Sequence, residues 1–218
     1  AATGVTWGLL TGDRQRGINL GVSLACQSAL KLAGVQLRTV GLEKLPAGPA
    51  VYVANHQSSL DPIAAATIMP GEFTVVAKKE ARFDPRSLVG SLLIEPAYID
   101  RGNSAQSRAT LDALVTRIRG GTSLLIFPEG TRSSTPVLGR FRKGGFHLAI
   151  QAGVPVVPVV LRNTGEILPR HARVLRPGTL DVAVLDPIHD WRVEDLDAQV
   201  AALRDRFAAT LADWPGSR

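Results

Sequence analysis

Short apolar runs alternate with helix-like patterns along most of the chain, which predicts a protein built from both strands and helices. Each run is continuously apolar, as is typical of a strand covered on both faces of a sheet. Strands are expected at residues 50–54, 73–77, 97–99, 123–127 and 156–161.

Helices are predicted between and after these strands. Residues 104–119 carry apolar side chains at helical spacing and are followed by two glycines. Residues 61–69 begin with Asp61 as the expected N-cap and Pro62 at the first helical position. A C-terminal helix is indicated by an apolar stripe formed by Val193, Leu196, Val200, Leu203, Phe207 and Leu211.

Residues 173–185 have the pattern of a β-hairpin that turns at Pro177-Gly178. A hairpin adds antiparallel pairing to the parallel strands expected elsewhere. The predicted fold class is therefore α/β, with a mixed, mostly buried β-sheet flanked by helices.

The N-terminal part of the chain has a different pattern. Its longest uncharged stretch, residues 17–30, is too short and too polar to span a bilayer, which takes about 20 mostly apolar residues. Its apolar side chains and flanking cations leave two interpretations open: a helix on a bilayer surface, or a helix packed on the core. We therefore divide the chain into an N-terminal amphipathic helical segment, residues 1–35, and a domain, residues 36–218.

The composition narrows the function classes. The chain has 218 residues, of which 45% are hydrophobic, which excludes a disordered protein. Its single cysteine, Cys26, excludes a disulfide framework and a cysteine-built zinc site, and we expect no metal or bound cofactor. The net charge of +6 suits an anionic membrane or a phosphorylated substrate. No basic run interleaves with aromatic residues, so we expect no nucleic acid partner.

Two of the predicted strands end in reactive side chains, and sites in such sheets form at the carboxyl ends of strands. The first is followed by residues 55–62, Asn-His-Gln-Ser-Ser-Leu-Asp-Pro. Across a strand-to-helix turn, Asp61 can reach His56, fix its tautomer and make it a general base. The spacing alone favours a structural histidine, so the interpretation depends on the second loop.

The second loop is residues 127–133, Phe-Pro-Glu-Gly-Thr-Arg-Ser. Arg132 carries a fork that matches phosphate oxygens. Glu129 is expected either to accept hydrogen bonds from a polyol or to hold Arg132 in place. Cations also follow two other strand ends, at Lys78 and Arg101, which favours an anion pocket.

Taken in order, these motifs resemble the four blocks of the glycerolipid acyltransferase family. Residues 55–62 look like the His-x4-Asp block, residues 98–101 (Tyr-Ile-Asp-Arg) like the second and residues 127–133 like the third. Residues 154–159 (Val-Pro-Val-Val-Pro-Val) look like the fourth. The resemblance covers about residues 36–165 and implies a glycerolipid-acyltransferase-like fold, with residues 36–218 as the catalytic domain.

The resemblance also implies roles for single residues. His56 would deprotonate a glycerol hydroxyl that attacks an acyl thioester, and Asp61 would orient His56. No acyl-enzyme is expected, so the neighbouring serines are not proposed as nucleophiles. The residues implied to bind the substrates are Lys78, Arg101, Glu129, Gly130, Thr131, Arg132 and Pro155.

The Glu-Gly-Thr-Arg form resembles members that use 1-acylglycerol-3-phosphate and make phosphatidate. The acyl donor would be acyl-CoA or an acyl carrier protein, and the protein would be peripheral or monotopic on the cytoplasmic face of the cell membrane. Two alternatives stay open. The acceptor could be another lysophospholipid, a glycolipid or glycerol-3-phosphate, or the chain could be a non-catalytic lipid-binding protein of the same fold.

Overall fold

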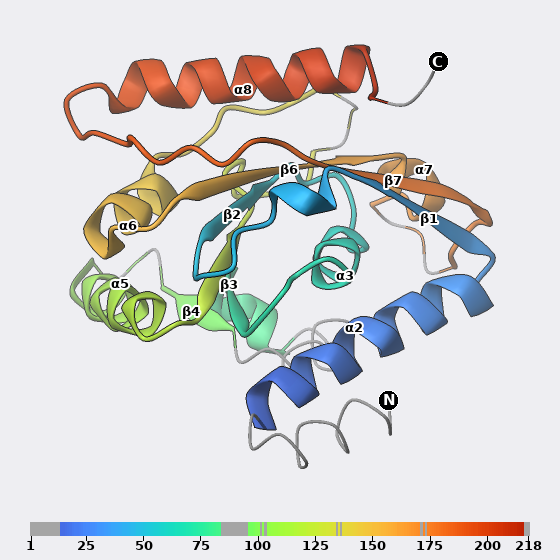
Figure 1. Ribbon diagram of the computed structural model, residues 1–218, viewed down its shortest axis with the longest axis horizontal. Helices are drawn as coiled ribbons and strands as arrows, with labels where there is room; N and C mark the ends of the chain where they lie inside the picture. The colour runs from blue at the N-terminus through green and yellow to red at the C-terminus, as the bar shows by residue number, and fades with distance from the viewer. Residues whose placement is uncertain are drawn as a thin grey trace.

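A computed structural model describes residues 14–83, 96–100, 102, 104–133, 135, 137–170, 172 and 174–215. In this part of the chain, seven strands form one sheet in the order β1-β7-β6-β2-β5-β3-β4 (Figure 1). Neighbouring strands are parallel except for β6 and β7. The predicted α/β fold with a mixed sheet is therefore confirmed. The strands are β1 Val35–Val40, β2 Val51–Ala54, β3 Phe73–Lys78, β4 Ala97–Ile99, β5 Ser123–Ile126, β6 Val156–Arg162 and β7 Gly178–Val184.

Helices cover both faces of this sheet, with α8 on one side and α2 and α3 on the other (Figure 1). The described α-helices are α2 Arg14–Leu32, α3 Asp61–Ala66, α5 Ser104–Arg119, α6 Gly144–Ala152, α7 Thr164–Ile167 and α8 Leu196–Ala212. Two short 3-10 helices are also present: η1 Leu42–Lys44 lies between β1 and β2, and η2 Lys79–Phe83 follows β3. The helix predicted at 104–119 matches α5, and it ends where Gly121 takes a φ of 109° that favours glycine.

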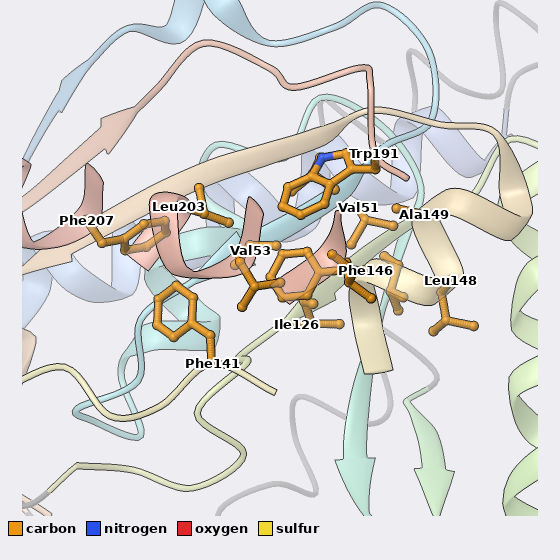
Figure 2. Close-up of a cluster of buried hydrophobic side chains, with 14 of the residues drawn as sticks. Val51, Val53, Ile126, Phe141, Phe146, Leu148, Ala149, Trp191, Leu203 and Phe207 are labelled. Carbon is orange, nitrogen blue, oxygen red and sulfur yellow. The ribbon is translucent and has the colours of Figure 1, made fainter. Parts of the chain in front are cut away.

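The central strand β2 contributes side chains to both apolar layers, because alternate side chains of a strand point to opposite faces of the sheet. Val51 and Val53 join the layer under α5, α6 and α8, whereas Tyr52 and Ala54 join the layer under α2 and α3. In the first layer Phe146 is fully buried and stacks on Trp191 at 4.8 Å between ring centroids (Figure 2). This packing holds β2 and β5 rigidly at the centre of the sheet.

The predicted hairpin at 173–185 is wrong. Residues 178–184 form the single strand β7, which pairs parallel with β1 and antiparallel with β6. The hydrogen-bonding partner of the Pro177-Gly178 segment is therefore distant in sequence, since Gly178 donates to the carbonyl of Gly34. The antiparallel pairing that the hairpin was expected to supply comes from β6 and β7 instead.

Two predicted helix starts also differ in the structure. The N-cap position of α3 is Leu60, and Asp61 is the first helical residue, because its carboxylate bonds to the preceding loop rather than to the helix. The C-terminal helix α8 starts at Leu196, so Val193 lies before it and is 59% exposed. The other predicted stripe residues lie within α8.

The N-terminal segment packs on the domain. Val22 and Leu30 of α2 are buried, and Ser23 donates a hydrogen bond to the carbonyl of Thr67 after α3. Residues 1–13 of this segment lie outside the described residues. Among the helices that the structure describes, none has the length and apolar character needed to cross a bilayer.

Candidate active site

The two predicted reactive loops meet at the carboxyl ends of two neighbouring strands. Residues 55–60 follow β2 and residues 127–133 follow β5, and these strands are parallel neighbours with Val53 opposite Ile126. From β2 the chain crosses to β3 through α3, whereas from β5 it crosses to β6 through α6. The two crossings leave in opposite directions, so the carboxyl ends of β2 and β5 form a topological switch point, which is where ligands usually bind in such sheets.

His56 and Asp61 meet as the sequence predicts. Nδ1 of His56 lies 2.8 Å from Oδ2 of Asp61, whose side chain is fully buried. The same oxygen accepts the backbone N–H groups of Gln57 and Ser58, each at 2.7 Å. An ionised carboxylate only accepts hydrogen bonds, so Nδ1 is the donor in this contact, and in the neutral imidazole the lone pair is then on Nε2. The arrangement leaves His56 able to take up a proton at Nε2.

The ring and backbone of His56 are held from several sides. Its ring stacks on Phe127, with 4.3 Å between centroids, and its side chain is 18% exposed. The backbone N–H of His56 donates to Oε1 of Glu129 at 2.8 Å, and the backbone carbonyl of His56 accepts the N–H of Ser133 at 2.7 Å. Residues of the second loop therefore fix the position of the base.

Glu129 is held by backbone N–H groups from two loops. It is 7% exposed, and its second oxygen, Oε2, accepts the N–H of Gly139 at 2.8 Å. Both carboxylate oxygens are thus engaged by backbone donors, from the loop after β2 and from the segment before α6. Glu129 is thus placed to organise the loops of the site, and among the described residues no hydrogen bond joins it to Arg132.

Arg132 links the two loops on the more open side of the site. It is half-buried, and its guanidinium donates to Oγ of Ser59. The preceding turn is formed by Gly130, whose φ of 72° favours glycine and whose N–H donates to the carbonyl of Phe127. Thr131 lies at the exposed end of this turn.

The other predicted substrate-binding residues lie in different places. Lys78 ends β3 and is exposed at the same edge of the sheet as His56. Arg101 lies outside the described residues. Pro155 precedes β6, and its carbonyl accepts the N–H of Val51 at the opposite end of β2. The structure therefore does not bring Pro155 together with His56.

A second lysine, Lys79, directly follows β3 and is paired with a carboxylate. Nζ of Lys79 lies 2.6 Å from Oδ2 of Asp100. The hydrogen bond from Lys79, and then the N–H of Gly102, lower the pKa of Asp100. The same contact raises the pKa of Lys79. Lys79 is therefore charged, but part of its charge is offset by its partner.

Two residues, Asn55 and Ser58, help to fix the site although the sequence predicted no role for them. The side chain of Asn55 donates to the carbonyl of Leu161 and accepts its N–H, both at 2.8 Å, which ties the end of β2 to β6. Oγ of Ser58 donates to the carbonyl of Leu168 at 2.7 Å. The signal for Asn55 was a polar residue directly after a buried strand, where backbone groups need partners, whereas Ser58 lies further along the loop.

The described residues contain no cluster of three or more His, Cys, Asp or Glu side chains suited to a metal ion. The polar groups that the site does offer are the imidazole of His56, the carboxylate that orients it, and the cations nearby.

Comparison with known proteins agrees with this picture. Residues 36–162, more than half of the chain, match a family model described as Acyltransferase. The 1-acyl-sn-glycerol-3-phosphate acyltransferase of Saccharomyces cerevisiae is 36% identical over 187 residues, or 84% of this chain and 62% of that protein. The protein of the same name from Salmonella typhimurium is 35% identical over 175 residues, or 75% of this chain and 69% of that protein.

A solved structure shares the fold. The crystal structure of the 1-acyl-sn-glycerophosphate (LPA) acyltransferase PlsC from Thermotoga maritima has a TM-score of 0.77 and 19% sequence identity, and the match covers 99% of this chain and 89% of that one. This chain spans about three fifths of the length of its yeast relative. On the match over residues 36–162 and the identity to these relatives, the chain belongs to the acyltransferase family.

Proposed function

We propose that this protein transfers a fatty acyl group from an acyl thioester to the free hydroxyl of 1-acylglycerol-3-phosphate, giving phosphatidate. The observation that carries the proposal is the His56–Asp61 pair, 2.8 Å apart at the carboxyl end of β2, with Arg132 on the neighbouring loop. The names of the relatives support the same reaction.

In this mechanism His56 acts first as a base and then as an acid. Nε2 takes the proton of the acceptor hydroxyl while the oxygen attacks the thioester carbonyl carbon. Asp61, buried against Nδ1, stabilises the imidazolium that forms. The C–S bond of the tetrahedral intermediate then breaks, and the imidazolium returns the proton to the departing thiolate. An ester and a free thiol are the products.

Direct transfer without an acyl-enzyme is supported by the state of the nearby serines. Oγ of Ser58 is buried and donates to the carbonyl of Leu168, and Oγ of Ser59 accepts from Arg132. Neither hydroxyl is paired with a base in the described residues, and a serine nucleophile needs one.

The phosphate of the acceptor would bind on the cationic side of the site. Arg132 offers a guanidinium fork for two phosphate oxygens, and Lys78 adds an exposed charge at the end of β3. Thr131, Gly130 and Arg101 stay in the proposal as further residues that bind the acceptor. The donor, acyl-CoA or acyl carrier protein, remains part of the proposal.

The decisive experiment compares His56→Ala with His189→Ala. Both remove one imidazole, and His189 is exposed before α8. Turnover is followed by free-thiol release from acyl-CoA with 1-acylglycerol-3-phosphate. We expect His56→Ala to lose about 10²- to 10⁴-fold in kcat, the range of general acid–base catalysis, and His189→Ala to match the wild type. Wild-type turnover in His56→Ala would exclude the mechanism.

A panel of acceptors tests the substrate assignment. Other lysophospholipids, a glycolipid and glycerol-3-phosphate are compared with 1-acylglycerol-3-phosphate at one donor concentration. Preference for another acceptor would keep the chemistry and change the substrate. Vesicle binding without any thioester consumption would support a non-catalytic lipid-binding protein instead.

We also propose that the protein binds the cytoplasmic face of the cell membrane as a peripheral or monotopic protein. The support is the net charge of +6 and the end of α2, where Leu32 is 90% exposed beside Lys31, while the single cysteine fits a reducing compartment. Sedimentation with anionic vesicles, compared with zwitterionic ones, tests this part separately.

A further inference from the structure

A helix outside the reactive loops is connected to the base by hydrogen bonds. Arg204 lies on α8, near the C-terminus of the chain, and its side chain is half-buried. Its Nη2 donates to the carbonyl of Leu138 at 2.9 Å, and its Nε donates to the carbonyl of Gly139 at 3.0 Å. One guanidinium therefore holds two successive carbonyls of the segment before α6.

This segment passes the connection on to His56. The N–H of Gly139 donates to Oε2 of Glu129 at 2.8 Å, and Oε1 of Glu129 accepts the N–H of His56 at 2.8 Å. The carbonyl of Leu138 and the N–H of Gly139 belong to the same peptide group. Arg204 therefore polarises the amide that donates to Glu129, and hydrogen bonds linked in this way strengthen one another in a site of low dielectric.

The packing leaves little freedom for this chain of contacts. Glu129 is 7% exposed, and a Cβ added at Gly139 would lie 2.9 Å from its Oε2. The carboxylate is pinned at both oxygens, so it cannot turn aside without breaking a hydrogen bond. A shift of the 138–139 segment would consequently move Glu129, and with it the backbone of His56.

We infer that Arg204 is a positioning residue for the base: through the 138–139 peptide and Glu129 it fixes the backbone of His56. The inference rests on the proposed function, because it assigns Arg204 a role in a reaction that uses His56. Arg204 lies outside residues 36–162, the part of the chain that matches the family model. The role therefore belongs to α8 of this chain and not to the matched blocks.

The simpler interpretation is that Arg204 only anchors α8 to the domain. The two differ in what the substitution changes. An anchor affects the stability of the whole fold and leaves the kinetics of the folded protein unchanged. A positioning residue changes kcat and the surroundings of the His56 amide in protein that remains folded.

The experiment compares Arg204→Gln with Arg206→Gln, which removes the same charge two positions along α8. The charge of Arg206 acts on Asp186, and no hydrogen bond described for its side chain reaches the 138–139 segment. Arg204→Lys keeps the charge and one donor. Gly139→Ala disturbs the same connection at its middle, where Gly139 contacts Glu129. Each variant is measured for kcat, for KM of both substrates, for the melting temperature, and for the ¹H–¹⁵N resonance of the His56 amide.

We expect Arg204→Gln to lower kcat by up to about 100-fold, the size of effect that a misplaced catalytic group produces, with both KM values unchanged. The His56 amide resonance should move, since its hydrogen bond to the carboxylate changes. Gly139→Ala should show the same pattern, Arg204→Lys should recover part of the rate, and Arg206→Gln should match the wild type.

The inference is overturned if folded Arg204→Gln keeps the wild-type kcat and His56 resonance, or if its loss of rate only follows loss of folded protein. Should Arg204→Gln not fold, Arg204→Lys decides on the same readouts, and a wild-type kcat and His56 resonance in that variant would overturn the inference. Failure of the proposed function looks different, because His56→Ala itself would then turn over at the wild-type rate. An inactive His56→Ala beside a fully active Arg204→Gln removes this inference alone.

Discussion

The two sides of the site are built differently. Asp61 and Glu129 on the base side are buried, and their carboxylates accept backbone N–H groups of the loops. On the cationic side, Lys78 and Lys79 are exposed, and Arg132 contacts only a serine hydroxyl among the hydrogen bonds described for it. The proton-transfer group is held by the fold, whereas the cations for the acceptor stand at its surface.

This difference separates rate from affinity. A buried polar group that loses its partner pays the full cost of desolvation, so the base side tolerates little change. Exposed charges are screened by salt and rearrange freely, so the cationic side should act on acceptor binding in proportion to charge. Substitutions on the first side should change kcat, and those on the second should change KM for the acceptor.

The largest effect is expected from Asp61→Asn. The amide oxygen can still accept the N–H groups of Gln57 and Ser58, so the loop should keep its shape. The negative charge that stabilises the imidazolium of His56 is lost. We expect kcat to fall by about 10³- to 10⁴-fold, as removal of the orienting carboxylate does in other His–Asp pairs, with little change in melting temperature.

Asp61→Ala is the matched comparison. It removes the charge and the acceptor together, and the buried N–H of Ser58 loses its acceptor at a cost of about 1–3 kcal/mol. It should lose both activity and stability. If Asp61→Asn turned over like the wild type, the buried carboxylate would serve the loop alone, and the distinction between the two sides would fail.

A smaller effect, and one on affinity, is expected from Arg132→Gln. Loss of a hydrogen bond to a charged group costs about 1.5–3 kcal/mol, so kcat/KM for 1-acylglycerol-3-phosphate should fall by about 10- to 100-fold, mostly through KM. The wild-type preference for this acceptor over uncharged 1-acylglycerol should shrink, and so should its sensitivity to salt.

Arg38→Gln is the control for Arg132→Gln, because Arg38 lies exposed on β1 at the far edge of the sheet and carries the same charge. It should leave acceptor preference unchanged. An Arg132→Gln protein that loses kcat and keeps its acceptor KM would instead place Arg132 with the base, through its contact with Ser59.

What the sequence could predict depends on whether the contacting residues are close together or far apart in the chain. The strands at 50–54, 123–127 and 156–161 are apolar runs, and the structure has strands there within about one residue. The His56–Asp61 contact was also predictable, since both residues belong to one short strand-to-helix turn. In these cases the residues that decide the structure are neighbours in sequence.

What was missed depends on distant partners. Residues 35–40 alternate in burial and form β1, but their pairing is with β7, more than 100 residues away. The helix α6 begins with Gly144-Gly145, two poor helix formers. Gly145 is needed because a Cβ there would lie 2.0 Å from Cδ1 of Ile126. The partners of Glu129 likewise come from loops whose approach only the folded sheet determines.

The smallest effect is expected from Asp100→Asn, which tests the surface side by pH. The pKa of Asp100 is lowered from 3.8 by Lys79, so its contribution to stability is present above that value and is lost as the pH falls through the lower folded value. The pKa of Lys79 is raised from 10.5, so its contribution is present below that value and is lost at higher pH. The pair therefore acts between these limits.

In urea unfolding, Asp100→Asn should lower the midpoint slightly at neutral pH, because both partners are near solvent and screened by salt. The difference from the wild type should shrink as the pH falls below 3.8 and as salt is added. Acceptor KM should fall slightly, because the positive charge of Lys79 is then no longer offset by the carboxylate of Asp100. A large loss of stability that persisted in acid or in high salt would show that this pair is held by the fold, as Asp61 is, and the cationic side would then be no more adaptable than the base side.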